Sequence, residues 1–143
     1  MAQNNKRTVN FEKYHGAGND FIMVADMEDR IRLSTEDIAA LCHRRYGIGA
    51  DGLIIIRPSQ ESDYRMHYYN SDGKESTMCG NGGRCVAAFA YSQEIAGKEQ
   101  RFLGPDGIHK ATILSSDNGY NRVTLQLSNV VNLHQGNGYY TLD

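Results

Sequence analysis

The feature that most constrains the fold is the segment after Cys79, which reads GNGGRCVAAFAYS. Between Cys85 and Ser92 it presents no polar face at helical spacing, and a helix that is apolar all round is stable only inside a core. The chain has 143 residues, 40% of them hydrophobic, which suffices for one core and one domain. We therefore expect a central buried helix with the rest of the chain packed around it.

The start of this helix is unusual because it combines a cysteine with three glycines. The first backbone N–H groups of a helix have no internal partners, and a buried helix must satisfy them in some other way. Gly80, Gly82 and Gly83 leave these amides open to a ligand, and the positive end of the helix favours an anion such as an α-carboxylate. The same end stabilises a neighbouring thiolate. A carboxylate held beside Cys79 indicates chemistry at Cα, although Cys79 packing at a tight turn is the structural alternative.

The other cysteines and the histidines show no metal-binding pattern. The three cysteines contain no C-x-x-C pair, which is typical of reduced thiols. On one helix, Cys79 and Cys85 would lie about a third of a turn apart, and adjacent Cys42 and His43 would point in different directions. None of these pairs has structural-zinc spacing. We expect no metal site, and we interpret Cys42 and Cys85 as small core residues.

Strands are expected at several short apolar or alternating segments: TVNFEKY, DFIMVAD, LIII, YRMHYY, IHKATIL and RVTLQL. A hairpin turn is expected at Asp117-Asn118-Gly119. The final GYYTLD is typical of a strand that is cut short. STED begins a helix predicted over residues 34–45, with Arg44 and Arg45 in its last turn and Gly47 as its stop.

The GIGADG segment fits the dinucleotide-binding pattern G-x-G-x-x-G letter for letter. That fingerprint must follow a strand and open a helix. Here the order is reversed, because the segment follows the predicted helix and leads into a strand. We interpret it as a glycine-rich turn that could lie close to a ligand.

Charge and hydropathy exclude several classes of partner. The formal net charge is −2 and there is no long run of like charges, so neither nucleic acid nor an anionic membrane is an expected partner. The N-terminal MAQNNKR is polar, unlike a signal peptide, and no apolar run reaches the roughly 20 residues that span a bilayer. We expect a cytoplasmic protein that binds a small polar molecule.

Three separated motifs, HGAGNDF, GIGADGLI and YYNSDGKESTMCGNGGRC, occur in the same order as in a known family. Over residues 9–94 the chain resembles the N-terminal half of diaminopimelate epimerase, a PLP-independent amino-acid epimerase. The resemblance implies an α+β fold of two similar domains, each a curled mixed or antiparallel sheet around a central helix that here starts near Cys79. It divides the chain into a polar tail (1–8), the first domain (9–127) and the start of a linker or second domain (128–143), with the C-terminal domain absent.

The resemblance also implies roles for individual residues. Cys79 takes the place of one of two cysteines that act on opposite faces of the substrate, with neither PLP nor a metal as cofactor. Asn19 and Asn70 match amide ligands of the substrate, and Gly80 with Asn81 matches the carboxylate-binding turn. From the residues alone, Asn19 and Asn70 could equally bond their own backbone in turns. The remaining matched positions, read as hydrogen-bond acceptors that fix loops, are Asp20, Asp51 and Asp72.

Two departures from the family pattern matter. Gly52 stands where some members carry a glutamine that contacts substrate, and the second cysteine, with its Glu-Arg pair, has no counterpart here. The chain alone is therefore expected to be inactive. In the family a C-terminal strand also completes the first domain, so we expect an exposed sheet edge and self-association. The expected partners are diaminopimelate, the missing domain and, in a homodimer, a second copy.

The implied activity is interconversion of LL- and meso-diaminopimelate for lysine and peptidoglycan synthesis. Three alternatives remain open at this stage. The chain could act on proline, hydroxyproline or histidine with the same fold, or bind an amino acid without catalysis. A phenazine-biosynthesis-type isomerase lacks the paired cysteines, so Cys79 argues against that alternative.

Overall fold

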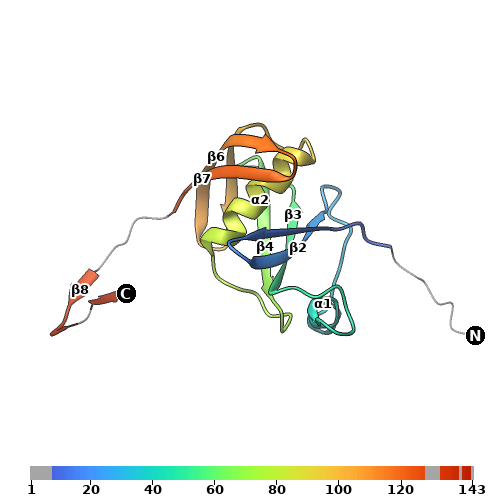
Figure 1. Ribbon diagram of the computed structural model, residues 1–143, viewed down its shortest axis with the longest axis horizontal. Helices are drawn as coiled ribbons and strands as arrows, with labels where there is room; N and C mark the ends of the chain where they lie inside the picture. The colour runs from blue at the N-terminus through green and yellow to red at the C-terminus, as the bar shows by residue number, and fades with distance from the viewer. Residues whose placement is uncertain (1–7, 128–132, 139, 143) are drawn as a thin grey trace, which may run out of the picture.

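The computed structural model describes residues 8–127, 133–138 and 140–142. In this part of the chain, one sheet contains seven strands whose spatial order is also their order along the chain (Figure 1). The strands are β1 (Glu12–Gly16), β2 (Asn19–Ala25), β3 (Gly52–Arg57), β4 (Tyr64–Asn70), β5 (Glu99–Gly104), β6 (Gly107–Asp117) and β7 (Tyr120–Gln126). β1 and β7 are therefore its two edge strands.

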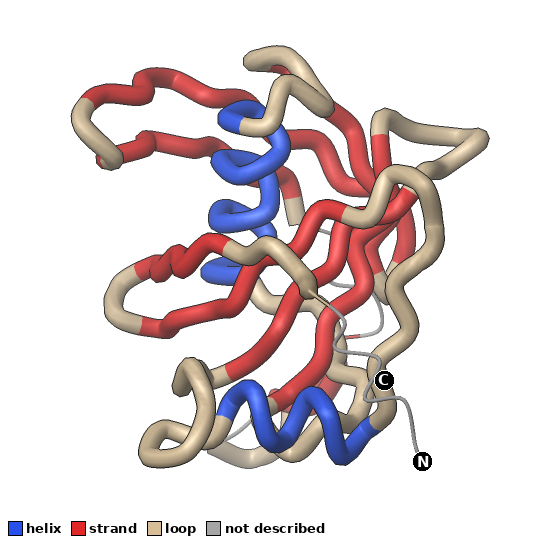
Figure 2. The backbone as a smooth tube through the Cα atoms, turned by 90° about the vertical axis from the view of Figure 1, so that its right-hand side faces the viewer, coloured by secondary structure: helices blue, strands red, loops and turns tan. Residues whose placement is uncertain are grey.

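The sheet is mixed. β2 pairs with β3 and β4 pairs with β5 in parallel, whereas the other neighbours are antiparallel. Parallel neighbours need a crossover connection, and each crossover here contains a helix: α1 (Thr35–Cys42) and α2 (Gly80–Ser92). Figure 2 shows the sheet curling around α2, with the β1–β2 and β6–β7 hairpins on either side of the helix and α1 outside the curl. The expected α+β fold, a curled mixed sheet around a central helix, is confirmed.

The main core lies between α2 and the inner face of the sheet. Val86, Ala87 and Ala90 are fully buried, and Phe89 is 2% exposed. They pack against large side chains from the strands: Phe21, Met23, Ile54, Ile56, Tyr64, Met66 and Phe102. The prediction of a buried helix after Cys79 is therefore confirmed.

A second core lies between α1 and the outer face. Ile38 and Cys42 from α1 pack against Ile22, Val24 and Ile55. Because β2 and β3 are covered on both faces, their sequences are continuous apolar runs rather than alternating ones.

The helix start predicted at STED is confirmed. Ser34 is the N-cap of α1, and its Oγ accepts a hydrogen bond from the backbone N–H of Asp37 at 3.0 Å. The Asp37 carboxylate accepts in return from the Ser34 N–H at 2.9 Å. The end predicted at residue 45 is wrong, because α1 stops at Cys42. His43 Nδ1 accepts from the N–H groups of Arg45 and Tyr46, and this turn replaces another turn of helix.

The strands predicted within residues 8–127 are present, but β5 was not predicted. Its sequence EQRFLG alternates buried and exposed residues, and one of the buried residues is polar Gln100. Tyr64 donates to Gln100 Oε1 at 2.6 Å, and Gln100 Nε2 donates to the carbonyl oxygens of Ala87 and Gly97. These bonds satisfy the buried amide, so an apolar pattern could not reveal the strand.

The predicted hairpin between β6 and β7 is confirmed. Asn118 and Gly119 both have positive φ, as its two-residue turn requires. Beyond β7, β8 (Leu133–Gln135) and β9 (Tyr140–Leu142) pair in a separate small sheet, which confirms a strand in GYYTLD. The predicted boundary at residue 128 and nearly all of the predicted N-terminal tail lie outside the described residues. In the described part, no helix has the length and apolarity needed to cross a bilayer.

Candidate active site

Cys79 is the N-cap residue of α2, with the extended backbone that this position requires (φ −132°, ψ 139°). Its Sγ accepts a hydrogen bond from the N–H of Gly82 at 3.2 Å, and its carbonyl oxygen accepts from the N–H of Gly83 at 2.9 Å. The thiol therefore satisfies one of the unpaired amides at the helix start. Unlike the two other cysteines, Cys79 is partly exposed.

The three glycines of this turn have different surroundings. A Cβ added at Gly80 would have no heavy atom within 4 Å, so this position faces open space. At Gly82 it would lie 3.4 Å from Ile54 Cδ1, and at Gly83 2.5 Å from Leu125 Cδ2. The expectation that all three glycines open the amides to a ligand therefore needs correction. Only Gly80 faces open space, whereas Gly82 and Gly83 allow the strands to approach the helix closely.

Two asparagines meet beside the thiol. Asn19 lies at the start of β2, and Asn81 lies in the first turn of α2. Asn81 Nδ2 donates to Asn19 Oδ1 at 3.3 Å, and Cys79 Sγ donates to the same oxygen at 3.8 Å. The structure thus brings together three of the predicted site residues from segments about 60 positions apart along the chain.

Asn70 lies at the end of β4, opposite Gly52 of β3. Its N–H donates to Lys74 O and its carbonyl oxygen accepts from the Gly73 N–H, both at 2.9 Å, so a tight turn follows β4. Gly52 also pairs with Phe21, so Asn70 and the start of β2 lie at the same end of the sheet. Among the described contacts, none joins the Asn70 side chain to Cys79.

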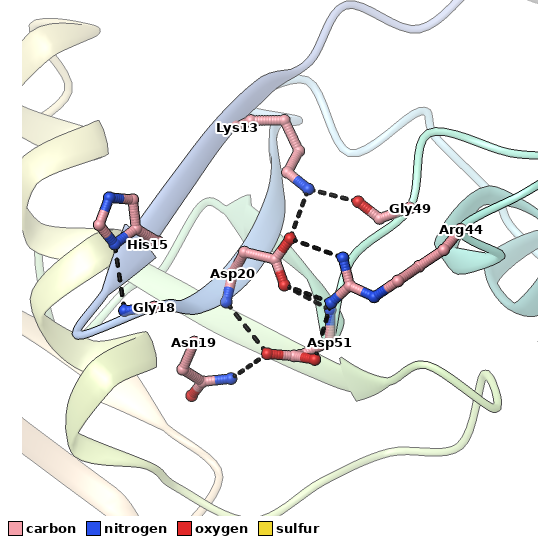
Figure 3. Close-up of polar contacts among 8 residues, drawn as sticks. All are labelled: Lys13, His15, Gly18, Asn19, Asp20, Arg44, Gly49 and Asp51. Atoms are coloured by element: carbon pink, nitrogen blue, oxygen red, sulfur yellow. Dashed lines mark hydrogen bonds and ion pairs between the residues drawn. The ribbon is translucent and has the colours of Figure 1, made fainter.

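An ion cluster anchors the loops behind Asn19 (Figure 3). Arg44 donates to Asp20 at 2.8 Å and to Asp51 at 2.9 Å, and Lys13 also donates to Asp20 and to the Gly49 carbonyl oxygen. The Arg44 guanidinium holds the pKa of the Asp20 carboxyl well below its usual range. Asp20 and Asp51 accept hydrogen bonds as predicted, and so does Asp72, from the Lys74 N–H at 2.9 Å. The contribution of Arg44 was missed because it was assigned to a helical turn that does not form.

The remaining cysteines occupy the two cores, as predicted. Cys42 is 3% exposed and Cys85 is 4% exposed. Burial raises the pKa of the Cys85 thiol to about 12, and it also raises the pKa of Cys42. Neither can supply thiolate near neutral pH. Within the described residues, no cluster of three or more His, Cys, Asp or Glu side chains could hold a metal ion.

Tyr68 is a further residue near the candidate site, and it was not identified from the sequence. Its ring contacts Phe21 edge to face, with centroids 5.6 Å apart, and it covers Gly52. A Cβ at Gly52 would lie 2.8 Å from Tyr68 Cε2 and 2.6 Å from the Tyr69 carbonyl oxygen. A glutamine therefore does not fit at position 52 in this arrangement. Burial raises the pKa of Tyr68, and the neighbouring Cys79 raises it further.

The same family is found by comparison with known sequences. The family model described as diaminopimelate epimerase matches residues 11–131. Diaminopimelate epimerase of Flavobacterium psychrophilum is 48% identical over 128 residues, which cover 85% of this chain and 47% of the relative. The enzyme of Chlorobaculum tepidum is 44% identical over 104 residues, covering 71% and 40%. The chain thus spans less than half the length of these relatives.

Solved structures with the same fold are more distant in sequence. The probable proline racemase of Agrobacterium radiobacter K84 superposes with a TM-score of 0.62 at 14% identity, covering 82% of this chain and 41% of that one. The hydroxyproline epimerase of Agrobacterium vitis gives 0.60 at 13% identity, covering 80% and 40%. These likenesses concern the fold alone. The sequence match over most of the residues that build the sheet and α2 shows that the chain belongs to the diaminopimelate epimerase family.

Proposed function

We propose that this chain supplies one half of the active site of an epimerase that interconverts LL- and meso-diaminopimelate. The observation that carries the proposal is the placement of Cys79, a partly exposed thiol at the N-terminus of a buried helix and beside Asn19. Membership of the family supports the substrate and the reaction class.

In the proposed reaction, Cys79 exchanges a proton with the α-carbon of the substrate on one face. A second cysteine, from the part of the protein outside this chain, acts on the opposite face. Gly80 and Asn81 bind the α-carboxylate at the helix N-terminus, and Asn19 and Asn70 hold the substrate. No PLP or metal takes part in this proposal.

The main difficulty of such a reaction is the weak acidity of a proton on a carbon that bears a carboxylate. Helix amides directed at that carboxylate stabilise the charge that develops when the proton leaves. Exclusion of water between two closed domains strengthens this effect. On this proposal the isolated chain does not epimerise, because inversion needs an acid on the opposite face of the substrate.

The proposal extends to the setting of the enzyme. The activity would serve lysine and peptidoglycan synthesis in the cytoplasm. Residues 9–127 would form the first domain, and residues 128–143 would lead into a C-terminal domain. Because β1 and β7 are edge strands of the described sheet, the partner would be that domain or, in a homodimer, a second copy.

Loss of the α-proton signal of meso-diaminopimelate in D₂O tests the proposal. The protein extended to the full length of its relatives should exchange and invert, and Cys79→Ser should abolish inversion. This chain alone should not invert, although exchange that depends on Cys79 would show that the half-site already supplies a base. Epimerisation by this chain that survives Cys79→Ser would overturn the assignment.

Two other functions are separated by the same samples. If proline, hydroxyproline or histidine competes with diaminopimelate and undergoes exchange in its place, the substrate is a different amino acid. If diaminopimelate protects Cys79 from alkylation but no exchange occurs even at full length, the protein is an amino-acid-binding module.

A further inference from the structure

A directional series of side-chain hydrogen bonds crosses the candidate site, and we call it the Arg84–Asp51 chain. Arg84 donates to Asn81 Oδ1 at 2.5 Å. Asn81 Nδ2 donates to Asn19 Oδ1 at 3.3 Å, and Asn19 Nδ2 donates to Asp51 Oδ2 at 2.8 Å. Each member therefore donates to the next, from a cation at one end to an anion at the other.

The charged ends determine this direction. A guanidinium carries only donors and a carboxylate only accepts. Asn81 must therefore turn its carbonyl oxygen toward Arg84, and Asn19 must turn its NH₂ group toward Asp51. The orientation of an asparagine amide follows from its hydrogen-bond partners, and here each amide has a charged partner that admits only one orientation.

Asp51 is itself held in place, as Figure 3 shows. Its Oδ1 accepts from Arg44 at 2.9 Å, and its Oδ2 also accepts from the backbone N–H of Asp20 at 3.2 Å. The Arg44 and Asp51 side chains are 59% and 45% exposed, so their ion pair contributes little to stability. Instead, Asp51 affects the orientation of the Asn19 amide, which donates to it.

The consequence reaches the thiol. Because the Asn19 NH₂ group is bound to Asp51, its carbonyl oxygen is the atom that accepts from Cys79 Sγ at 3.8 Å. An acceptor beside a thiol stabilises its S–H form, whereas a donor would stabilise the thiolate. The carbonyl of Asn19 therefore opposes the positive end of α2.

We propose that Asp51 is a positioning residue, which acts on Cys79 through the amide of Asn19. Asp51 makes Asn19 present an acceptor, rather than a donor, to the sulfur. Arg84 fixes the orientation of the Asn81 amide in the same way, at the donor end of the Arg84–Asp51 chain. This inference rests on the proposed function in one respect, that Cys79 is the reacting thiol.

The rate at which iodoacetamide alkylates Cys79 tests the proposal without any substrate. Mass spectrometry of the peptide that contains Cys79 separates it from Cys42 and Cys85. Asp51→Ala removes the charged partner of the Asn19 NH₂ group. The neutral amide of Asn81, which donates to Asn19 Oδ1 at 3.3 Å, is then the remaining group that opposes a turn of this NH₂ group toward the sulfur. The alkylation rate should rise at least about threefold, because thiolate is the form that reacts.

Two matched variants separate orientation from charge. Asp51→Asn removes the charge. Its one amide oxygen takes the place of Oδ2, where the Asp20 N–H and the Asn19 NH₂ group both donate, while the exposed Arg44 keeps its bonds to Asp20, so Asn19 keeps its acceptor. This isosteric variant should alkylate within about twofold of the unchanged protein. Asp20→Ala removes the other carboxylate that binds Arg44, together with the acceptor of the Asp51 backbone N–H. It should also stay within about twofold, since the bond from Asn19 Nδ2 to Asp51 Oδ2 remains.

A double-mutant cycle completes the test. If Asp51 acts through Asn19, Asp51→Ala should have no further effect in an Asn19→Ala background. An equal rise in both backgrounds, or an equal rise in Asp51→Asn or Asp20→Ala, would overturn the proposal in favour of a through-space charge effect. An unchanged rate in Asp51→Ala would also overturn it. Protection of Cys79 by meso-diaminopimelate, measured separately, tests the proposed function and not this inference.

Discussion

The two ends of the sequence GNGGRCVAAFA form one helix but differ in their polar contacts and in their burial. In the first turn of α2, side chains bond to polar groups on distant segments, and Cys79 is partly exposed. One turn later the helix is packed on all sides, and Cys85 is buried with a raised pKa. Two thiols six positions apart therefore have different chemistry. Position relative to the helix terminus, rather than residue type, thus determines which of these two cysteines is accessible.

The largest expected effect on stability comes from the buried part of α2. Phe89 is 2% exposed and contacts Tyr14 edge to face, with centroids 5.7 Å apart. Phe89→Ala should lower the free energy of unfolding by about 3–5 kcal/mol because it leaves a cavity between α2 and the sheet. Urea denaturation measures the change. As the matched control, Cys79→Ser should change it by less than about 1 kcal/mol, since serine is a favoured N-cap. Comparable losses in the two variants would contradict the division between the two regions.

The burial of Cys85 should make the free energy of unfolding fall at alkaline pH. Its pKa is raised from 9.0 to about 12, chiefly by burial. Below pH 9 the thiol is protonated in both states and its contribution to stability is complete. Above that pH the unfolded chain releases the proton while the folded protein keeps it, so stability falls by up to about 1.4 kcal/mol per pH unit.

Urea unfolding measured between pH 8 and about pH 11 follows this loss. Other groups also titrate in this range, so the comparison is with Cys85→Ala, which retains all of them. The variant should show a shallower decline with pH than the unchanged protein. Identical slopes would mean that the thiol of Cys85 is not buried in its protonated form.

A smaller effect is expected where the two regions meet. A methyl group at Gly83 would lie 2.5 Å from Leu125 Cδ2 and equally close to Met78 Cε. Both atoms are ends of flexible side chains, so Gly83→Ala should cost only about 1–2 kcal/mol of overpacking. Thermal unfolding should therefore show a lowered Tm. An unchanged Tm would mean that β7 can move away from the helix without cost.

The smallest effect on stability is expected at Gly80, which faces open space. Gly80→Ala should alter the free energy of unfolding by less than about 0.5 kcal/mol. The added methyl group should nevertheless weaken the protection of Cys79 by diaminopimelate, because it would occupy the open space beside the helix start that the proposed carboxylate fills. Unweakened protection at unchanged stability would place the carboxylate elsewhere.

Sequence patterns predicted the elements that are built from apolar residues. The buried α2, the continuous apolar strands β2 and β3, and the DNG hairpin follow from hydrophobicity and turn chemistry alone. β5 was not predicted because buried Gln100 interrupts its apolar pattern. The Gln100 side chain bonds to Tyr64 and Ala87, which are distant in sequence. The predicted end of α1 was wrong because a single ring nitrogen of His43 accepts hydrogen bonds from the backbone N–H groups of Arg45 and Tyr46.

The candidate site was predictable to a different extent. Cys79 and Gly80 follow from the chemistry of a buried helix start, whereas Asn19 and Asn81 were expected only because the motifs resemble a family. Nothing in the spacing indicates that an amide at position 19 contacts one at position 81. The Arg84–Asp51 chain depends on side-chain directions that exist only after the segments have packed.

The strand order has a kinetic consequence. Because β1 to β7 pair only with their neighbours along the chain, the four antiparallel pairs close short loops, an arrangement associated with fast folding. Synthesis proceeds from the N-terminus, and every member of the Arg84–Asp51 chain precedes β5. During translation the groups around Cys79 therefore leave the ribosome before the strands that complete the burial of α2, and the site takes its final geometry only when β5, β6 and β7 have closed over the helix.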